Sequence, residues 1–176
     1  MKIVACVKVV PEEEQIKVLP SRELSLDDAA AKISQYDLNA LEAGKRLAAA
    51  AGGSLTALSV GGSSYLDATK IRKDILSRGA DDLKLLVSDD TPFEDSLETA
   101  KAIVKALETI DGYDLVLCGT GSSDMYSQVV GIQVGALLGI PVLNNVTDIQ
   151  ITENGIEAER TLENIVERFA LPLPAV

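Results

Sequence analysis

Short apolar runs alternate along the chain with longer amphipathic segments. The runs cover residues 2–10, 55–60, 83–87 and 114–118, and they are rich in Val, Ile, Leu and Ala with little polar alternation. Such runs are typical of parallel strands that are buried on both faces of a sheet. We therefore predict four buried parallel strands.

Amphipathic segments with helical spacing separate these runs. Helices are predicted over residues 37–51, 65–78 and about 94–110, with a last helix that begins near Asp124. Asp37 is a suitable N-cap for the first of them. In the last helix, Gly131 and Gly135 would allow close packing on the sheet because they lack a Cβ.

Strand–helix alternation of this kind predicts an α/β fold. We expect a doubly wound, mostly parallel sheet of the 3-2-1-4-5 type, with right-handed crossovers and helices on both faces. Ligands of such sheets bind outside the carboxyl ends of the strands, where the strand order reverses. Strands one and four would be neighbours there, so Val7 and Lys8 should face the same crevice as residues 119–124.

Two segments depart from this alternation. Residues 15–26 contain two short runs broken at Pro20, which predicts a hairpin excursion. After Pro141, residues 146–151, 156–160 and 165–171 read as antiparallel strands, with a hairpin turn at Asn154-Gly155. We expect residues 145–176 to complete the same domain as residues 1–144. The apolar segment 171–176 begins as if another strand followed, and we expect the sequence to be a piece of something longer.

The loop after the fourth strand is the main candidate for chemistry. Gly119 and Gly121 permit close approach of backbone to a ligand, and Ser122, Ser123 and Asp124 suit a helix N-terminus that attracts phosphate. The alternative is an ordinary strand-to-helix turn with a capped helix. Neither a Rossmann glycine pattern nor a Walker motif is present.

Composition narrows the classes of function. Sixteen basic and 27 acidic side chains give a net charge of −11, which disfavours binding to nucleic acid or to an anionic membrane. No run reaches the roughly 18 apolar residues of a membrane span, and no signal-peptide pattern is present, so we expect a cytoplasmic protein without direct membrane insertion. Cys6 and Cys118 are interpreted as buried free thiols of a reducing compartment.

Six separated segments carry a family resemblance. They are residues 2–8, 31–43, 58–62, 72–80, 119–131, and Glu159-Arg160 leading to 173–176. Together, in this order, they closely resemble the β-subunit of electron-transfer flavoproteins, FixA-type members in particular. The resemblance implies an adenine-nucleotide α-hydrolase-like fold, in agreement with the predicted α/β sheet.

The resemblance also implies a function, cofactors and partners. Such β-subunits pair with an α-subunit that holds most of the FAD, and they themselves keep AMP or a second FAD. The heterodimer carries electrons from a dehydrogenase to a quinone- or ferredoxin-linked acceptor. Because the chain has no histidine and no nucleophile–base pair, we expect no catalytic residue and no metal site, and an electron carrier rather than a stand-alone catalyst.

Carried over by position, the resemblance implies a nucleotide site drawn from four parts of the chain. The residues are Cys6, Val7, Lys8, Ser34, Gln35, Tyr36, Asp37, Val60, Gly61, Gly119, Gly121, Ser122, Ser123, Asp124, Ser127, Gln128, Val129 and Val130. The family often has Asn-Pro where Ser34-Gln35 stands, and its helix glutamine aligns with Val129 rather than Gln128. Its hairpin turn is replaced here by residues 163–167.

Several of these residues have a second interpretation. Asp124 could act on a nucleotide or only cap a helix, and Lys8 could offset phosphate charge or be a solvated strand end. Tyr36 could stack on adenine or cover the edge of the sheet.

Two other functions are characterised by motifs that this chain lacks. A universal-stress-type ATP-binding module is the alternative function, although its Gly-x-x-Gly-x9-Gly-Ser/Thr loop is missing. An ATP pyrophosphatase-type enzyme would need Ser-Gly-Gly-x-Asp-Ser after the first strand, which is also missing.

Overall fold

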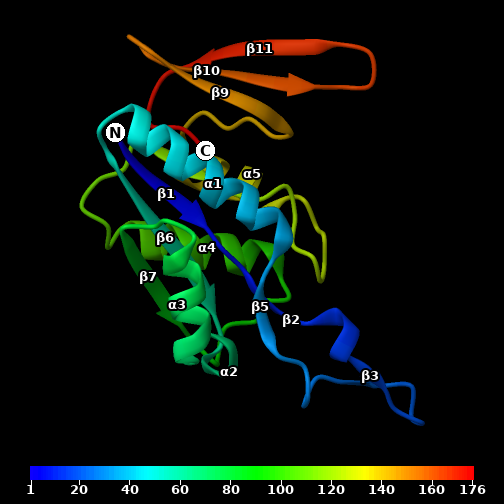
Figure 1. Ribbon diagram of the computed structural model, residues 1–176. Coiled ribbons are helices and arrows are strands. Elements are labelled where there is room, and N and C mark those ends of the chain that lie inside the picture. Colours follow the sequence, from blue (N-terminus) through cyan, green and yellow to red (C-terminus); the bar gives the residue numbers. More distant parts are fainter.

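A four-stranded parallel sheet forms the centre of the computed structural model, which describes residues 1–176 (Figure 1). Its strands are β1 (Lys2–Cys6), β6 (Ser54–Gly61), β7 (Asp82–Val87) and β8 (Leu115–Leu117), in the order β7-β6-β1-β8. The α/β class and the parallel strands are confirmed.

The predicted fifth strand is wrong. Beside β8 the structure has only an isolated parallel bridge between Leu115 and Ala175, so the sheet ends there. The physical reason lies in the flanking sequence: Pro172 and Pro174 have no N–H group to donate to a ladder, which leaves Ala175 to pair alone.

Helices cover both faces of the sheet. Three of them pack with one hydrophobic cluster: α1 (Gln35–Ala50), α2 (Ser63–Leu66) and α3 (Thr69–Ser77). On the opposite face lie α4 (Ser96–Leu107) and α5 (Val130–Leu138), which pack with a second cluster. The doubly wound arrangement therefore holds for this sheet.

Alternate residues of β1 contribute to the two clusters. Ile3 and Ala5 belong to the cluster beneath α1, whereas Val4 and Cys6 belong to the cluster beneath α4. All four are almost completely buried. Because successive side chains of a strand point to opposite faces, an apolar run without alternation is what a strand between two helical layers requires.

Three predicted helix boundaries need correction. Helix α1 has Ser34 rather than Asp37 at its N-cap position, and Asp37 lies inside the helix. The last helix begins at Val130, so Asp124 does not cap it. The segment 65–78 is interrupted at Asp67 and Ala68 and forms α2 and α3 instead of one helix.

The chain leaves the main sheet after Cys6, so the first strand does not continue to Val10 as predicted. Next come β2 (Val9–Pro11), the 3₁₀ helix η1 (Glu13–Gln15), and β3 (Lys17–Val18), which pairs with β4 (Leu24–Ser25) as the predicted hairpin. β2 pairs with β5 (Ala31–Ile33), which leads into α1. In Figure 1 this excursion projects from one end of the molecule.

The C-terminal antiparallel sheet lies at the opposite end from that excursion (Figure 1). The three predicted antiparallel strands are β9 (Val146–Thr152), β10 (Gly155–Thr161) and β11 (Val166–Leu171), and their order in the sheet is β11-β10-β9. Ile156 is buried in the same cluster as the core beneath α1. No helix is long and apolar enough to span a lipid bilayer.

Candidate functional site

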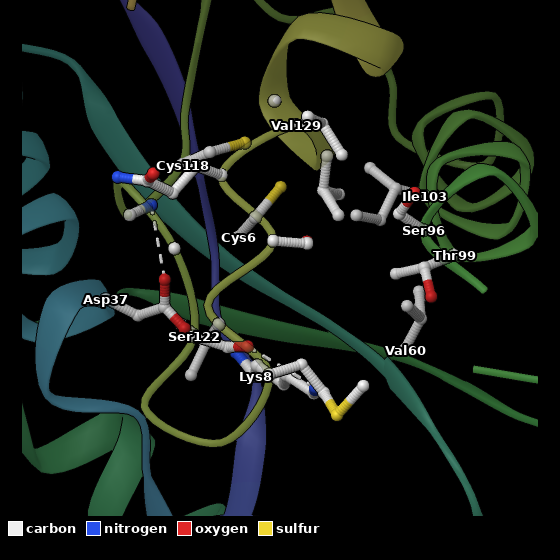
Figure 2. Close-up of a pocket in the computed structure, with 18 of the residues that line it drawn as sticks. Cys6, Lys8, Asp37, Val60, Ser96, Thr99, Ile103, Cys118, Ser122 and Val129 are labelled. Carbon is white, nitrogen blue, oxygen red and sulfur yellow. Dashed lines mark hydrogen bonds between the residues drawn. The ribbon is translucent and has the colours of Figure 1, made fainter. Parts of the chain in front are cut away.

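A cleft opens beside the carboxyl ends of β1, β6 and β8, between them and helix α4. It encloses about 820 Å³ of space, including its open mouth. Residues from the end of β1, the loop that follows β8, and the first turns of α4 line it (Figure 2). This is the position at which doubly wound sheets bind ligands.

Asp37 holds two sides of the cleft together. One carboxylate oxygen accepts a hydrogen bond from the Lys8 N–H at 2.8 Å, and the other accepts from the Gly119 N–H at 3.2 Å. Burial raises the pKa of Asp37 to about 7, although both N–H donors oppose this rise. Gly119 has no room for a Cβ, because that atom would collide with Asp37 Oδ1. Asp37 therefore fixes the end of β1 against the loop after β8 (Figure 2).

Lys8 supplies the positive charge of the cleft. Its Nζ lies 2.7 Å from Asp124 Oδ2 and 3.5 Å from Ser122 Oγ. Partial burial acts to raise the pKa of Asp124, but hydrogen bonds from Lys8, Ser122 and the Met125 N–H hold it below its usual value. The prediction that Lys8 and residues 119–124 face one crevice agrees with this geometry.

The loop from Gly119 to Val129 is held in shape by an aromatic contact. Tyr126 and Gln128 have positive φ angles of 47° and 60°, which non-glycine residues rarely adopt. The Tyr126 ring lies 5.1 Å from that of Tyr36, centroid to centroid. A Cβ on Gly121 would lie 2.7 Å from the Tyr126 ring, so this glycine makes room for the tyrosine.

Several N–H groups of this loop have no hydrogen-bond acceptor within the protein. They belong to residues that line the cleft, namely Gly121, Ser122, Ser127 and Gln128. The buried Ser123 Oγ also has no partner. Unpaired main-chain donors beside a lysine favour an anionic ligand, because the N–H dipoles and the ammonium group both stabilise negative charge.

Helix α4 forms the wall that sequence reasoning missed. Ser96, Thr99 and Ile103 line the cleft, and Ser96 Oγ accepts a hydrogen bond from Gln133 Nε2 at 3.2 Å. Their spacing of three and four residues places them on one helix face, and this signal could have identified them. The other unpredicted lining residues are Leu58, Phe93, Glu94, Cys118, Thr120, Met125 and Gly131.

The structure brings most of the predicted site residues to the cleft. Those that line it are Cys6, Val7, Lys8, Asp37, Val60, Gly119, Gly121, Ser122, Ser127, Gln128, Val129 and Val130.

The remaining predicted residues do not line the cleft. They are Ser34, Gln35, Tyr36, Gly61, Ser123 and Asp124. Ser34 is buried and its Oγ accepts a hydrogen bond from the Ser123 N–H at 3.2 Å, so both residues support the loop from behind.

The two glycines of the last helix pack against different neighbours. A Cβ on Gly131 would lie 3.2 Å from that of Cys118, and a Cβ on Gly135 would lie 2.6 Å from that of Val142. Gly131 therefore packs on the end of β8 as predicted. Gly135 packs instead on the segment that leaves the helix.

Fold and cleft together define a doubly wound α/β protein with an anion-favouring cleft at the carboxyl edge of its sheet. Comparison with known families gives a more specific assignment. Residues 24–176 match the electron transfer flavoprotein domain, and the chain belongs to this family. Membership implies an association with flavin, and proteins of the family form heterodimers.

Proposed function

We propose that the chain is the β-subunit of an electron-transfer flavoprotein and that its cleft holds an adenine nucleotide, either AMP or a second FAD. One observation carries the proposal: three segments far apart in sequence, at Cys6–Lys8, Val60 and 119–130, meet in a single cleft. These are the segments whose residues resemble the nucleotide site of the β-subunit.

The phosphate end of such a nucleotide fits the loop after β8. Lys8 would offset its charge, and the unpaired N–H groups of Gly121, Ser122, Ser127 and Gln128 would donate to its oxygens. Asp124 now pairs with Lys8, so it would compete with the phosphate for this cation. Lys8 and Asp124 would therefore determine the affinity of the cleft for the phosphate group.

The base and sugar fit the less polar part of the cleft. Val60, Ile103 and Val129 present apolar side chains there, and Ser96 and Thr99 add hydroxyl groups that can select orientation. Asp37 is engaged by the N–H groups of Lys8 and Gly119, so its role is to position these two segments. Tyr36 is packed on Tyr126 outside the cleft, and this argues for support of the loop rather than stacking on adenine.

Electron transfer itself would depend on a partner. FAD, held mostly by the α-subunit of the heterodimer, would supply the redox chemistry when bound. The residues of this chain would bind the nucleotide, exclude water from it and present a docking surface to the α-subunit. A dehydrogenase would be the electron donor, and a quinone- or ferredoxin-linked protein would be the acceptor.

Co-expression with a candidate α-subunit tests the proposal. The chain is purified together with an α-subunit encoded beside it, and the complex is denatured with acid and its released nucleotides are identified by mass spectrometry. We expect a yellow heterodimer that releases FAD together with either AMP or a second equivalent of FAD. A colourless pair that does not associate, or a complex without any adenine nucleotide beyond the α-subunit's FAD, would contradict it.

A further inference from the structure

The only two cysteines of the chain, one at the end of β1 and one directly after β8, both line the cleft. β1 and β8 are parallel, and their register ends with Ala5 beside Leu117. Cys6 is the last residue of β1 and Cys118 directly follows β8, so each comes one residue after this pair. Residues in register on neighbouring strands project to the same face of a sheet. Figure 2 shows both side chains extending from the strand ends into the same part of the cleft.

The backbone spacing suits a covalent link between the two sulfurs. Neighbouring strands lie about 4.8 Å apart, and disulfides join residues whose Cα atoms are about 4.4–6.8 Å apart. Asp37 already ties the adjoining Lys8 and Gly119 together.

The two thiols differ in access. Cys6 is 8% exposed, whereas Cys118 is partly exposed at the cleft wall. The neighbouring Cys118 thiol, burial and the negative charge of Asp37 all raise the pKa of Cys6. An oxidant in the cleft therefore meets Cys118 first, and Cys6 remains a protonated thiol until it reacts with its neighbour.

We propose that Cys6 and Cys118 form a reversible dithiol–disulfide modification site that reacts with hydroperoxides. The Cys118 thiolate attacks the terminal oxygen of the peroxide, whose O–O bond breaks and releases an alcohol, leaving Cys118 as a sulfenic acid. The Cys6 sulfur then attacks the Cys118 sulfur, gives up its proton and expels water. Two thiols lose two electrons to one peroxide, and the products are a disulfide, an alcohol and water.

The proposal is based on the strand register and does not depend on the proposed binding of a nucleotide. To test it, the full chain is reduced, freed of reductant and treated with tert-butyl hydroperoxide at mildly alkaline pH, then digested without reduction and mapped by mass spectrometry. We expect one linked pair of peptides containing Cys6 and Cys118, loss of both alkylatable thiols, and full reversal by excess reduced glutathione.

Single-cysteine variants give the matched control. Cys6→Ala should accumulate a Cys118 sulfenic acid that dimedone traps, and Cys118→Ala should react at least tenfold more slowly than the natural chain. Unlinked oxidised cysteines, a disulfide between two chains, or no reaction with the peroxide would overturn the proposal. If either variant fails to fold, the linked peptide pair from the natural chain still decides the outcome.

Discussion

Asp37 shows how one buried residue can organise a site through its hydrogen bonds. It is buried, it accepts hydrogen bonds from Lys8 and Gly119, and its neighbour Gly119 cannot carry a side chain. The main chain of Lys8 is held in this way, and its side chain lines the cleft. The position of the Lys8 ammonium group therefore depends on the carboxylate of Asp37 inside helix α1.

Replacing this carboxylate tests how much the two hydrogen bonds of Asp37 stabilise the protein. In Asp37→Asn one oxygen becomes an NH₂ group, so one of the two N–H donors loses its acceptor, and we expect a loss of about 1–3 kcal/mol in the free energy of unfolding. Urea denaturation of both proteins at about pH 4, below the range in which the charge of Asp37 lowers stability, measures the difference. An unchanged urea midpoint would show that these hydrogen bonds contribute nothing to stability.

The pKa of Asp37 predicts a dependence on pH. It rises from 3.8 in the reference state to about 7 in the folded protein, so the folded state holds a proton that the unfolded state releases between these values. The free energy of unfolding contributed by Asp37 should therefore fall as pH rises from about 4 to about 7 and level off above that. Denaturation curves across this range should show a slope in the natural chain that Asp37→Asn lacks; equal slopes in the two proteins would contradict the prediction.

Lys8 gives a prediction about affinity. The Lys8–Asp124 pair is partly exposed, so its loss should change stability little. Lys8→Met should nevertheless weaken AMP binding about tenfold or more, because a charged hydrogen-bond donor is lost, and adenosine binding should change much less. Calorimetric titration of the heterodimer measures both ligands.

The matched control is Lys105→Met, an exposed lysine on α4. It should leave both affinities unchanged. Asp124→Asn should tighten AMP binding, because it frees Lys8 from its present partner. Equal losses for AMP and adenosine in Lys8→Met would mean that the lysine does not act on the phosphate.

At the scale of elements, close packing of the last helix determines where the loop after β8 ends. Gly131 lies against Cys118 and Gly135 against Val142, so α5 is held between the end of β8 and the chain that follows it. The loop of residues 119–129 connects the end of β8 with the start of α5.

Gly135→Ala tests this packing. The added Cβ would lie 2.6 Å from Val142 Cβ, an atom next to the main chain that cannot rotate away. We expect overpacking, which typically costs about 1–3 kcal/mol, to outweigh the gain of up to about 1 kcal/mol in helix propensity. Thermal unfolding should show a lower Tm, whereas Ala136→Ser, at an exposed position of the same helix, should stay within about 0.5 kcal/mol. An unchanged or higher Tm for Gly135→Ala would refute the argument.

At the scale of the whole molecule, the antiparallel sheet shares the core of the α/β part. Ile156 of β10 is 2% exposed and belongs to the cluster that contains Ile3, Leu41 and Leu115. One continuous core predicts one cooperative unfolding transition. Such a transition is expected if residues 1–144 and 145–176 form a single domain.

A pair of isoleucines that face each other across β10 and β9 provides the test. Ile156→Ala should cost about 2–5 kcal/mol because it leaves a cavity in the shared core, whereas Ile151→Ala, at a position 39% exposed, should cost far less. Circular dichroism and tyrosine fluorescence should report a single coincident transition in both variants. Two separate transitions would show that the antiparallel sheet is an independent unit.

Sequence patterns alone determined the secondary structure class and most of the cleft. Apolar runs without alternation predicted four buried strands, and Asn154-Gly155 predicted the C-terminal hairpin, because both signals depend on local chemistry. The family resemblance placed the candidate site on residues 6–8, 34–37, 60–61 and most positions of 119–130. Most of these residues line one cleft, but Asp37 is the only one of 34–37 that does so.

Only the tertiary structure decided how those residues are used. Asp37 was predicted as a helix cap, and Asp124 as a nucleotide contact or a helix cap. In the structure, the buried Asp37 accepts hydrogen bonds from Lys8 and Gly119, and Asp124 forms an ion pair with Lys8. The contribution of α4 to the cleft and the presence of Cys118 together with Cys6 on its wall were also not predicted. The physical reason is that a side chain's partner across a fold depends on strand register and helix position, and neither is encoded within the few residues on either side of it.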